Sequence, residues 1–253
     1  MSARNDELYV GYLTPAATVS RRLRWISVVA IAVAVGVAIT AATSHRRLPA
    51  SAFEFGTTRS FEGTIRELPA PMLLVSTGSG TDNSSRTSAW LLVAPGKHGA
   101  AEAVRGLDGE RVRVSGTLLY RDGQTMVEID PESLVPLGMQ QAGAPATVDL
   151  GSVTLAGEIV DSKCYLGVMN PGESKTHRDC AVRCISGGAP PLFVARNAAG
   201  NRVQMLLVGD DGRAINRDVL PFVAEPVEIT GHLVSMGELF VLHANTTAFR
   251  RLS

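Results

Sequence analysis

The residues of this chain with the most reactive side chains gather in one short stretch. All three cysteines, Cys164, Cys180 and Cys184, lie within 21 residues that also contain His177. Three thiolates and one imidazole are the soft donors that bind Zn²⁺, Cu(I) and Fe–S clusters in proteins. The sequence therefore predicts a metal site with three cysteines and one histidine, Cys164, His177, Cys180 and Cys184, but it does not identify the metal.

A short helix is expected to bring most of these donors together. Thr176 followed three residues later by Asp179 is typical of a helix start, with Thr176 as the N-cap, and Gly187–Gly188 is a plausible stop. About ten helical residues between these signals would put donors that are three and seven positions apart on one face. The donors on that face are His177, Cys180 and Cys184.

Other groups near the cysteines have expected supporting roles. Cys164 would arrive from the end of the preceding strand, where Asp161 is predicted to accept a hydrogen bond from the ligating imidazole. Met169 is a further soft atom in the loop, although methionine more often fills gaps in packing. Nearby positive charges favour the thiolate form of Cys180. These charges are on Lys163, Arg178 and Arg183.

Two other interpretations of the cysteines stay open. Their spacing is not one of the common zinc-finger spacings, and an exported protein is found where thiols oxidise. A disulfide from Cys164 to Cys180 or Cys184 would staple the loop and leave one spare thiol. The cysteines could also be redox-active thiols.

An internal repeat determines how the rest of the chain is interpreted. The second copy contains an insertion, residues 161–188, between its first two strands, and this insertion carries every cysteine. The order of the matching segments is the same in both copies. They are Phe61–Glu67 with Leu155–Asp161, Trp90–Val93 with Met205–Val208, and Glu110–Leu119 with Glu225–Val234.

Each copy is predicted to form five short strands with one short helical segment before the fourth strand. The helical segments are expected at His98–Leu107 and Arg213–Val223. This order resembles the OB-fold, a small Greek-key barrel that often binds ligands through its loops. The alternative is a β-sandwich or another small barrel. The expected class is all-β with short helices, with two tandem OB-like five-stranded barrels after one N-terminal transmembrane helix. The expected barrels are residues 61–138 and 151–253, with linkers at 44–60 and 139–150.

The N-terminal region contains an apolar segment. Residues 25–43 carry no charge and are just long enough to span a membrane. Three arginines precede this segment and two follow it, which favours a cytoplasmic segment 1–24 and barrels on the outer side of a bacterial inner membrane, in the periplasm. A cleaved signal peptide is the alternative.

Composition narrows the function. With 24 basic and 24 acidic residues the chain has no excess positive charge to attract nucleic acid, so no nucleic-acid partner is expected. The sequence has no P-loop, dinucleotide fingerprint or nucleophile elbow. These observations favour a membrane-anchored periplasmic binding or accessory protein over an enzyme. It would hold Zn, Cu or an Fe–S cluster and act with a membrane-bound respiratory or metal-handling protein. The alternatives are a periplasmic thiol–disulfide redox protein and a structural module with a stapled loop.

Overall fold

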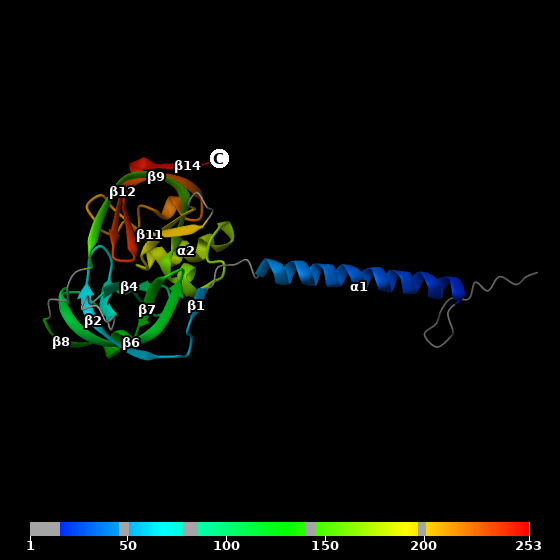
Figure 1. The fold of residues 1–253 in the computed structure, drawn as a ribbon, viewed down its shortest axis with the longest axis horizontal. Coiled ribbons are helices and arrows are strands. Elements are labelled where there is room, and N and C mark those ends of the chain that lie inside the picture. Colours follow the sequence, from blue (N-terminus) through cyan, green and yellow to red (C-terminus); the bar gives the residue numbers. More distant parts are fainter. Residues whose placement is uncertain (1–15, 46–50, 78–85, 140–144, 197–200, 253) are drawn as a thin grey trace, which may run out of the picture. The chain divides into compact units, whose positions relative to one another are not determined.

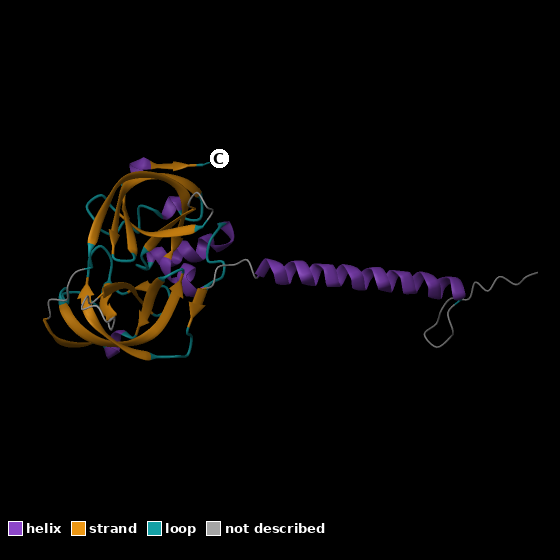
Figure 2. Cartoon of the chain, viewed as in Figure 1, coloured by secondary structure: helices purple, strands orange, loops and turns teal. Residues whose placement is uncertain are grey.

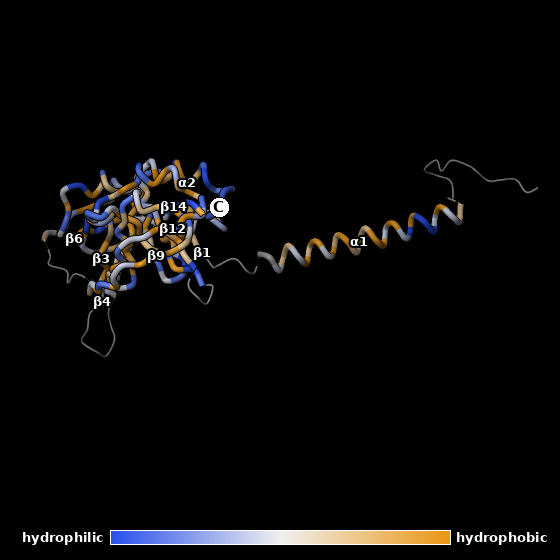
Figure 3. The backbone as a smooth tube through the Cα atoms, turned by 90° about the horizontal axis from the view of Figure 1, so that it is seen from above, coloured by the Kyte–Doolittle hydropathy of each residue, from blue (hydrophilic) through white to orange (hydrophobic). Residues whose placement is uncertain are grey.

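The computed structural model describes residues 16–45, 51–77, 86–139, 145–196 and 201–252, in two compact units, residues 1–48 and 49–253. The first unit contains helix α1 (Ala17–His45), which includes the predicted span 25–43. An 18-residue window of α1 has a mean hydropathy of 2.4, so the helix is long and apolar enough to cross a membrane, as a signal sequence also is. Figure 3 shows that α1 is apolar along most of its length and has a hydrophilic stretch near its N-terminal end. The predictions for residues 1–15 and 46–50 lie outside the described residues.

The first barrel is closed by five strands (Figure 1). Around the barrel, β2 pairs with β3, β3 with β4, β4 with β7, β7 with β6, and β6 with β2. Only the β4–β7 pair is parallel. The strands are β2 (Arg59–Arg66), β3 (Met72–Thr77), β4 (Arg86–Ala94), β6 (Glu110–Arg121) and β7 (Gln124–Ile129). The shorter strands β1 (Ser51–Phe53), β5 (His98–Gly99) and β8 (Val135–Met139) extend the sheet.

The second barrel repeats this topology. Strand β9 pairs with β10, β10 with β11, β11 with β13, β13 with β12, and β12 with β9, and again only the third of these pairs is parallel. The strands are β9 (Thr147–Asp161), β10 (Pro191–Arg196), β11 (Arg202–Val208), β12 (Pro226–Met236), β13 (Leu239–His243) and the short β14 (Phe249–Arg251). The predicted class is confirmed: two closed five-stranded OB-like barrels follow one N-terminal apolar helix.

Glycines at equivalent positions explain why both copies close in the same way. A Cβ atom at Gly63 would lie 2.5 Å from the backbone oxygen of Leu74, and one at Gly157 would lie 2.3 Å from the oxygen of Val194. Real side chains do not tolerate such distances, so β2 and β9 can bend against the neighbouring strand only where a glycine removes the side chain.

The two predicted helical links are not helices. Residues 98–107 form β5 and a series of turns (Figure 2), and residues 213–223 form turns and a single 3-10 turn, η4 (Leu220–Phe222). In the first segment His98 and Gly99 pair with β4, and Gly106 has a φ of +79°, so the backbone is not helical at either end. In the second segment Pro221 lacks the N–H that would continue an α-helix.

The predicted linkers contribute strand residues. Strand β1 lies inside the expected linker 44–60 and pairs with β6, and β9 begins at Thr147, inside the expected linker 139–150. Residues 140–144 of that linker lie outside the described residues. The segments outside the barrel sheets are therefore shorter than the linkers that the composition predicts.

Three hydrophobic cores result, one in each barrel and a third shared by both. The shared core joins Leu91 of the first barrel to Leu206 of the second, and it includes Cys164 and Cys184. Burying one leucine stabilises a fold by about 1.5–3 kcal/mol, so separating the barrels would expose a costly surface together with the cysteines.

Candidate metal site

The insertion in the second barrel folds into short helical pieces that line the shared core. After β9 the chain forms a π-helical turn, η2 (Cys164–Val168), then a 3-10 turn, η3 (Lys175–His177), and helix α2 (Arg178–Ser186). Figure 1 shows α2 between the two barrels. The insertion therefore positions its side chains at the junction of the barrels, and the site does not belong to the second barrel alone.

The predicted start of α2 is wrong, and its predicted end is confirmed. The N-cap of α2 is His177, without a side-chain cap, because the chain first makes the 3-10 turn η3. The hydroxyl of Thr176 instead lies 3.1 Å from that of Ser174. At the other end Gly187 is the C-cap, and Gly188 has a φ of +99°, a backbone conformation that glycine adopts easily.

The three sulfur atoms form a compact triangle. The Sγ atom of Cys164 lies 3.7 Å from that of Cys180 and 3.9 Å from that of Cys184, and all three lie within 4.8 Å of one another. Cys180 and Cys184 are one turn apart on α2, while Cys164 opens η2. Cys164 and Cys184 are buried and Cys180 is half-buried, and none of the three forms a disulfide.

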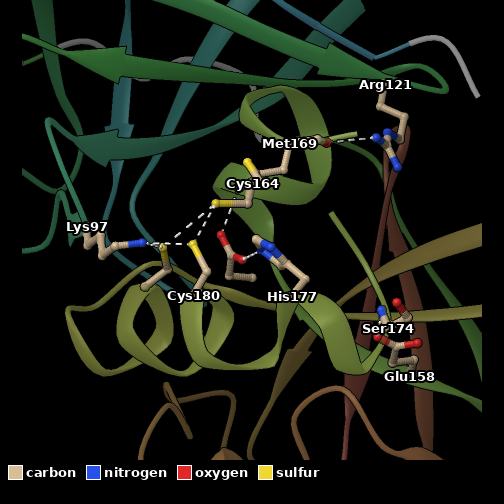
Figure 4. Close-up of polar contacts among 10 residues, drawn as sticks. Lys97, Arg121, Glu158, Cys164, Met169, Ser174, His177 and Cys180 are labelled. Atoms are coloured by element: carbon tan, nitrogen blue, oxygen red, sulfur yellow. Dashed lines mark hydrogen bonds and ion pairs between the residues drawn. The ribbon is translucent and has the colours of Figure 1, made fainter. Parts of the chain in front are cut away.

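A residue that the sequence did not suggest is the fourth neighbour of the sulfurs. Lys97, in the turn between β4 and β5 of the first barrel, has its Nζ atom 2.8 Å from the Sγ atom of Cys180 and 3.7 Å from that of Cys184. Figure 4 shows the Lys97 amine directed at the sulfurs. The site therefore combines thiols from one barrel with a cation from the other.

Glycines allow this close approach. The N–H of Gly99 donates to the carbonyl of Gly187 over 2.9 Å. A Cβ atom at Gly187 would lie 1.8 Å from the carbonyl oxygen of Lys97, and one at Gly99 would lie 2.0 Å from that of Gly188. Only bare backbone fits at this contact, so these glycines are the sequence signal that could have indicated Lys97.

Two of the three predicted positive charges have other partners. Lys163 is buried, donates to the carbonyls of Ala94 (2.9 Å) and Gly96 (2.6 Å), and forms an ion pair with Glu128. Arg178 forms an ion pair with Glu225. Lys163 thus fixes the turn that carries Lys97, and the ammonium next to the thiols belongs to Lys97.

His177 lies in a second group of donors, with Asp161 and Cys164, and not with all three sulfurs. Its Nε2 atom lies 3.0 Å from Oδ2 of Asp161, while Oδ1 of Asp161 accepts the N–H of Cys164 over 2.8 Å. Asp161 is fully buried and His177 nearly so. The predicted contact between Asp161 and His177 is therefore present, and Cys164 is shared by the two groups.

Arg121 is a second functional candidate that sequence reasoning missed. Its guanidinium is buried and stacks 4.3 Å from the centre of the Tyr165 ring. It donates to the carbonyl of Met169 over 3.4 Å (Figure 4). Met169 itself is 45% exposed, so its contribution here is its backbone carbonyl. Arg121 thereby fixes η2, and with it Cys164, against the first barrel.

The surroundings shift the pKa values of Cys164 and Cys184 in opposite directions. The hydrogen bond with Cys164 lowers the pKa of Cys184 to about 7. The positive charge of Lys97 also lowers this pKa, whereas burial and the negative charge of Asp161 raise it. The same hydrogen bond, together with burial and Asp161, raises the pKa of Cys164. The hydrogen bond to Cys180 raises the pKa of Lys97. In metal-free protein near pH 7, Cys184 therefore loses its proton before Cys164 does.

No model of a known protein family matches the sequence, and a comparison with curated proteins found no match.

Proposed function

We propose that this protein is a membrane-anchored binding or accessory protein that holds one soft metal ion, zinc or copper, with Cys164, Cys180 and Cys184. The barrels lie outside the cytoplasmic membrane, in the periplasm of a bacterium. The partner is a membrane-bound respiratory or metal-handling protein, and the site binds or transfers the ion without performing catalysis.

The observation that carries this proposal is the sulfur triangle. Two thiolates bound to one ion at 2.3 Å in a tetrahedral arrangement lie about 3.8 Å apart. The Cys164–Cys180 and Cys164–Cys184 distances of 3.7 and 3.9 Å match that spacing. Little movement is then needed to bind an ion, because the fold already holds the donors in position.

A single ion fits better than a cluster. Fe–S clusters are bound by thiolates that usually reach different irons, so the cluster itself separates the sulfurs. Here the three sulfurs lie within 4.8 Å of one another, in or against the shared core. A cluster would have to force the barrels apart, which disfavours it.

The apolar helix and the balanced charge support the cellular setting. Helix α1 is suited to anchor the chain. The positive flank before its apolar segment favours barrels on the outer side of the membrane. The equal numbers of acidic and basic residues argue against a nucleic-acid partner.

The second candidate is a thiol–disulfide redox protein. The lowered pKa of Cys184 favours this function, since a thiolate is the nucleophile in disulfide exchange, and Cys164 lies next to it as a partner. The third candidate is a purely structural role, in which a disulfide between two of these cysteines holds the insertion in place.

Metal analysis separates these functions. Full-length protein is purified anaerobically in detergent, and its metal content and free thiols are counted. We expect about one zinc or copper per chain, lost in Cys184→Ser and kept in Ser186→Ala, a control on the exposed side of the same helix. Protein without metal that lacks two thiols would contradict the proposal. Reversible reduction of the disulfide that replaces those two thiols would assign the redox function, and resistance of this disulfide to reduction would assign the staple.

A further inference from the structure

We infer that the ion is Cu(I), bound by three sulfurs, and that Lys97 selects it as a cation beside the ligands and not as a ligand. This inference rests on the proposed function and specifies the ion for the same three cysteines. It makes a residue of the first barrel the determinant of metal specificity for a site that the second barrel builds.

The fourth position next to the sulfurs is taken by a group that cannot bind a cation. A lysine ammonium has three N–H donors and no free electron pair. Its Nζ atom lies 2.8 Å from Cys180 and 3.7 Å from Cys184, on the side of the triangle that the first barrel faces. Structural zinc sites need a fourth donor atom in that position, whereas soft Cu(I) is satisfied by three thiolates.

The nearest alternative donors do not lie within reach of all three sulfurs. Among the described residues, His177 and Asp161 are grouped with Cys164 but not with the complete sulfur triangle. The Nε2 atom of His177 faces Oδ2 of Asp161 at 3.0 Å, and Oδ1 of Asp161 accepts a backbone N–H. The fold therefore presents three sulfur donors, which suit three-coordinate copper, with a cation beside them.

The backbone of Lys97 is fixed, while its side chain is not enclosed. The carbonyl of the preceding residue, Gly96, accepts from Lys163, and the carbonyl of Lys97 packs against Gly187. The residue itself is exposed. The ammonium can therefore move aside while an ion enters or leaves by Cys180, the half-buried cysteine, and then return to its hydrogen bond.

The test compares the affinities of the full-length protein for Cu(I) and Zn²⁺ in detergent, without oxygen, using chromophoric chelators as competitors. We expect wild-type protein to bind one Cu(I) with three sulfur neighbours in its X-ray absorption spectrum, and to bind Zn²⁺ more weakly.

Lys97→Gln should weaken Cu(I) binding about tenfold, while Lys97→Arg, which keeps the charge, should retain it. Lys97→His supplies a fourth donor and should strengthen Zn²⁺ binding by about tenfold or more. Lys175→Gln, an exposed lysine of the same insertion, is the control and should change neither affinity.

Three results would overturn the inference. If wild-type protein binds Zn²⁺ more tightly and with four ligands, or if Lys97→Gln and Lys97→His leave both affinities unchanged, the assignment of Cu(I) and Lys97 fails while the metal site remains. If neither ion binds wild-type protein or Lys97→His, the proposed function fails as well. Circular dichroism of each variant separates lost binding from lost folding, and Lys97→His, which is expected to gain Zn²⁺ affinity, keeps the test valid if Lys97→Gln unfolds.

Discussion

The Nζ atom of Lys97 lies 2.8 Å from the Sγ atom of Cys180, although 83 positions separate them in the chain. This contact joins the two barrels at the cysteines, because Lys97 belongs to the first barrel and Cys180 to the insertion of the second. The state of the thiols and the packing of the barrels are therefore linked, and a change in one is expected to alter the other.

The thiol titration of metal-free protein should depend on Lys97. The pKa of Cys184 is lowered to about 7, so the thiolate should form as the pH rises through 7 and be lost as it falls below. Lys97 contributes to this lowering, and Lys97→Gln should move the midpoint upward, toward an ordinary thiol. Thiolate absorbance near 240 nm, or the rate of alkylation against pH, measures the midpoint. A wild-type midpoint near that of a free cysteine, or one unaffected by Lys97→Gln, would contradict the expectation.

His177 should support the site without binding the ion. His177→Gln offers Asp161 a similar N–H donor, so we expect it to keep one metal per chain. Cys164→Ser should lose the metal. His177→Ala leaves the buried Asp161 carboxylate without that partner and should destabilise the fold by about 3 kcal/mol. Metal analysis and urea unfolding measure both effects. Loss of the metal in His177→Gln would instead identify the imidazole as the fourth ligand.

Lys163 should be essential for the contact between the barrels. Its ammonium is buried and satisfies two carbonyls of the β4–β5 turn and the Glu128 carboxylate. Lys163→Met removes all three interactions, and we expect a loss of about 3–5 kcal/mol together with weaker metal binding, since the turn carries Lys97. Lys175→Met, at an exposed position, is the control. A stability within 1 kcal/mol of wild type (about the effect of a surface substitution) would show that Lys163 is not needed.

The fold could be predicted from sequence because its signals are local. Alternation in short segments such as Glu110–Leu119 indicates strands, and Gly63 and Gly157 recur where each barrel needs a bare backbone. The gathering of the cysteines could also be predicted, since Cys180 and Cys184 lie one helical turn apart. The start of α2 was misplaced because a 3-10 turn precedes it, and N-cap residue preferences do not distinguish the two kinds of helix.

Lys97 could not be predicted because its position depends on how two folded barrels pack. No local pattern records that packing, and the ion pairs of Lys163 with Glu128 and of Arg178 with Glu225 depend on it as well. The glycines were the only hint. Gly187–Gly188 ends α2, as the sequence predicts, but Gly187 and Gly99 also give the neighbouring barrel access to the sulfurs.

The last prediction tests these glycines directly. Gly187→Ala would put a Cβ atom 1.8 Å from the carbonyl oxygen of Lys97, so the β4–β5 turn must move away. We expect a loss of stability of about 1–3 kcal/mol and an upward shift of the Cys184 titration, because Lys97 moves away from the thiols. Ser186→Gly, one residue earlier on α2 and exposed, introduces no new contact and serves as the control for helix flexibility. Thermal unfolding and the thiolate absorbance are followed on the same samples. If Gly187→Ala lowers stability but leaves the titration unchanged, Lys97 reaches the sulfurs independently of this backbone contact, and the glycines serve only the packing of the barrels.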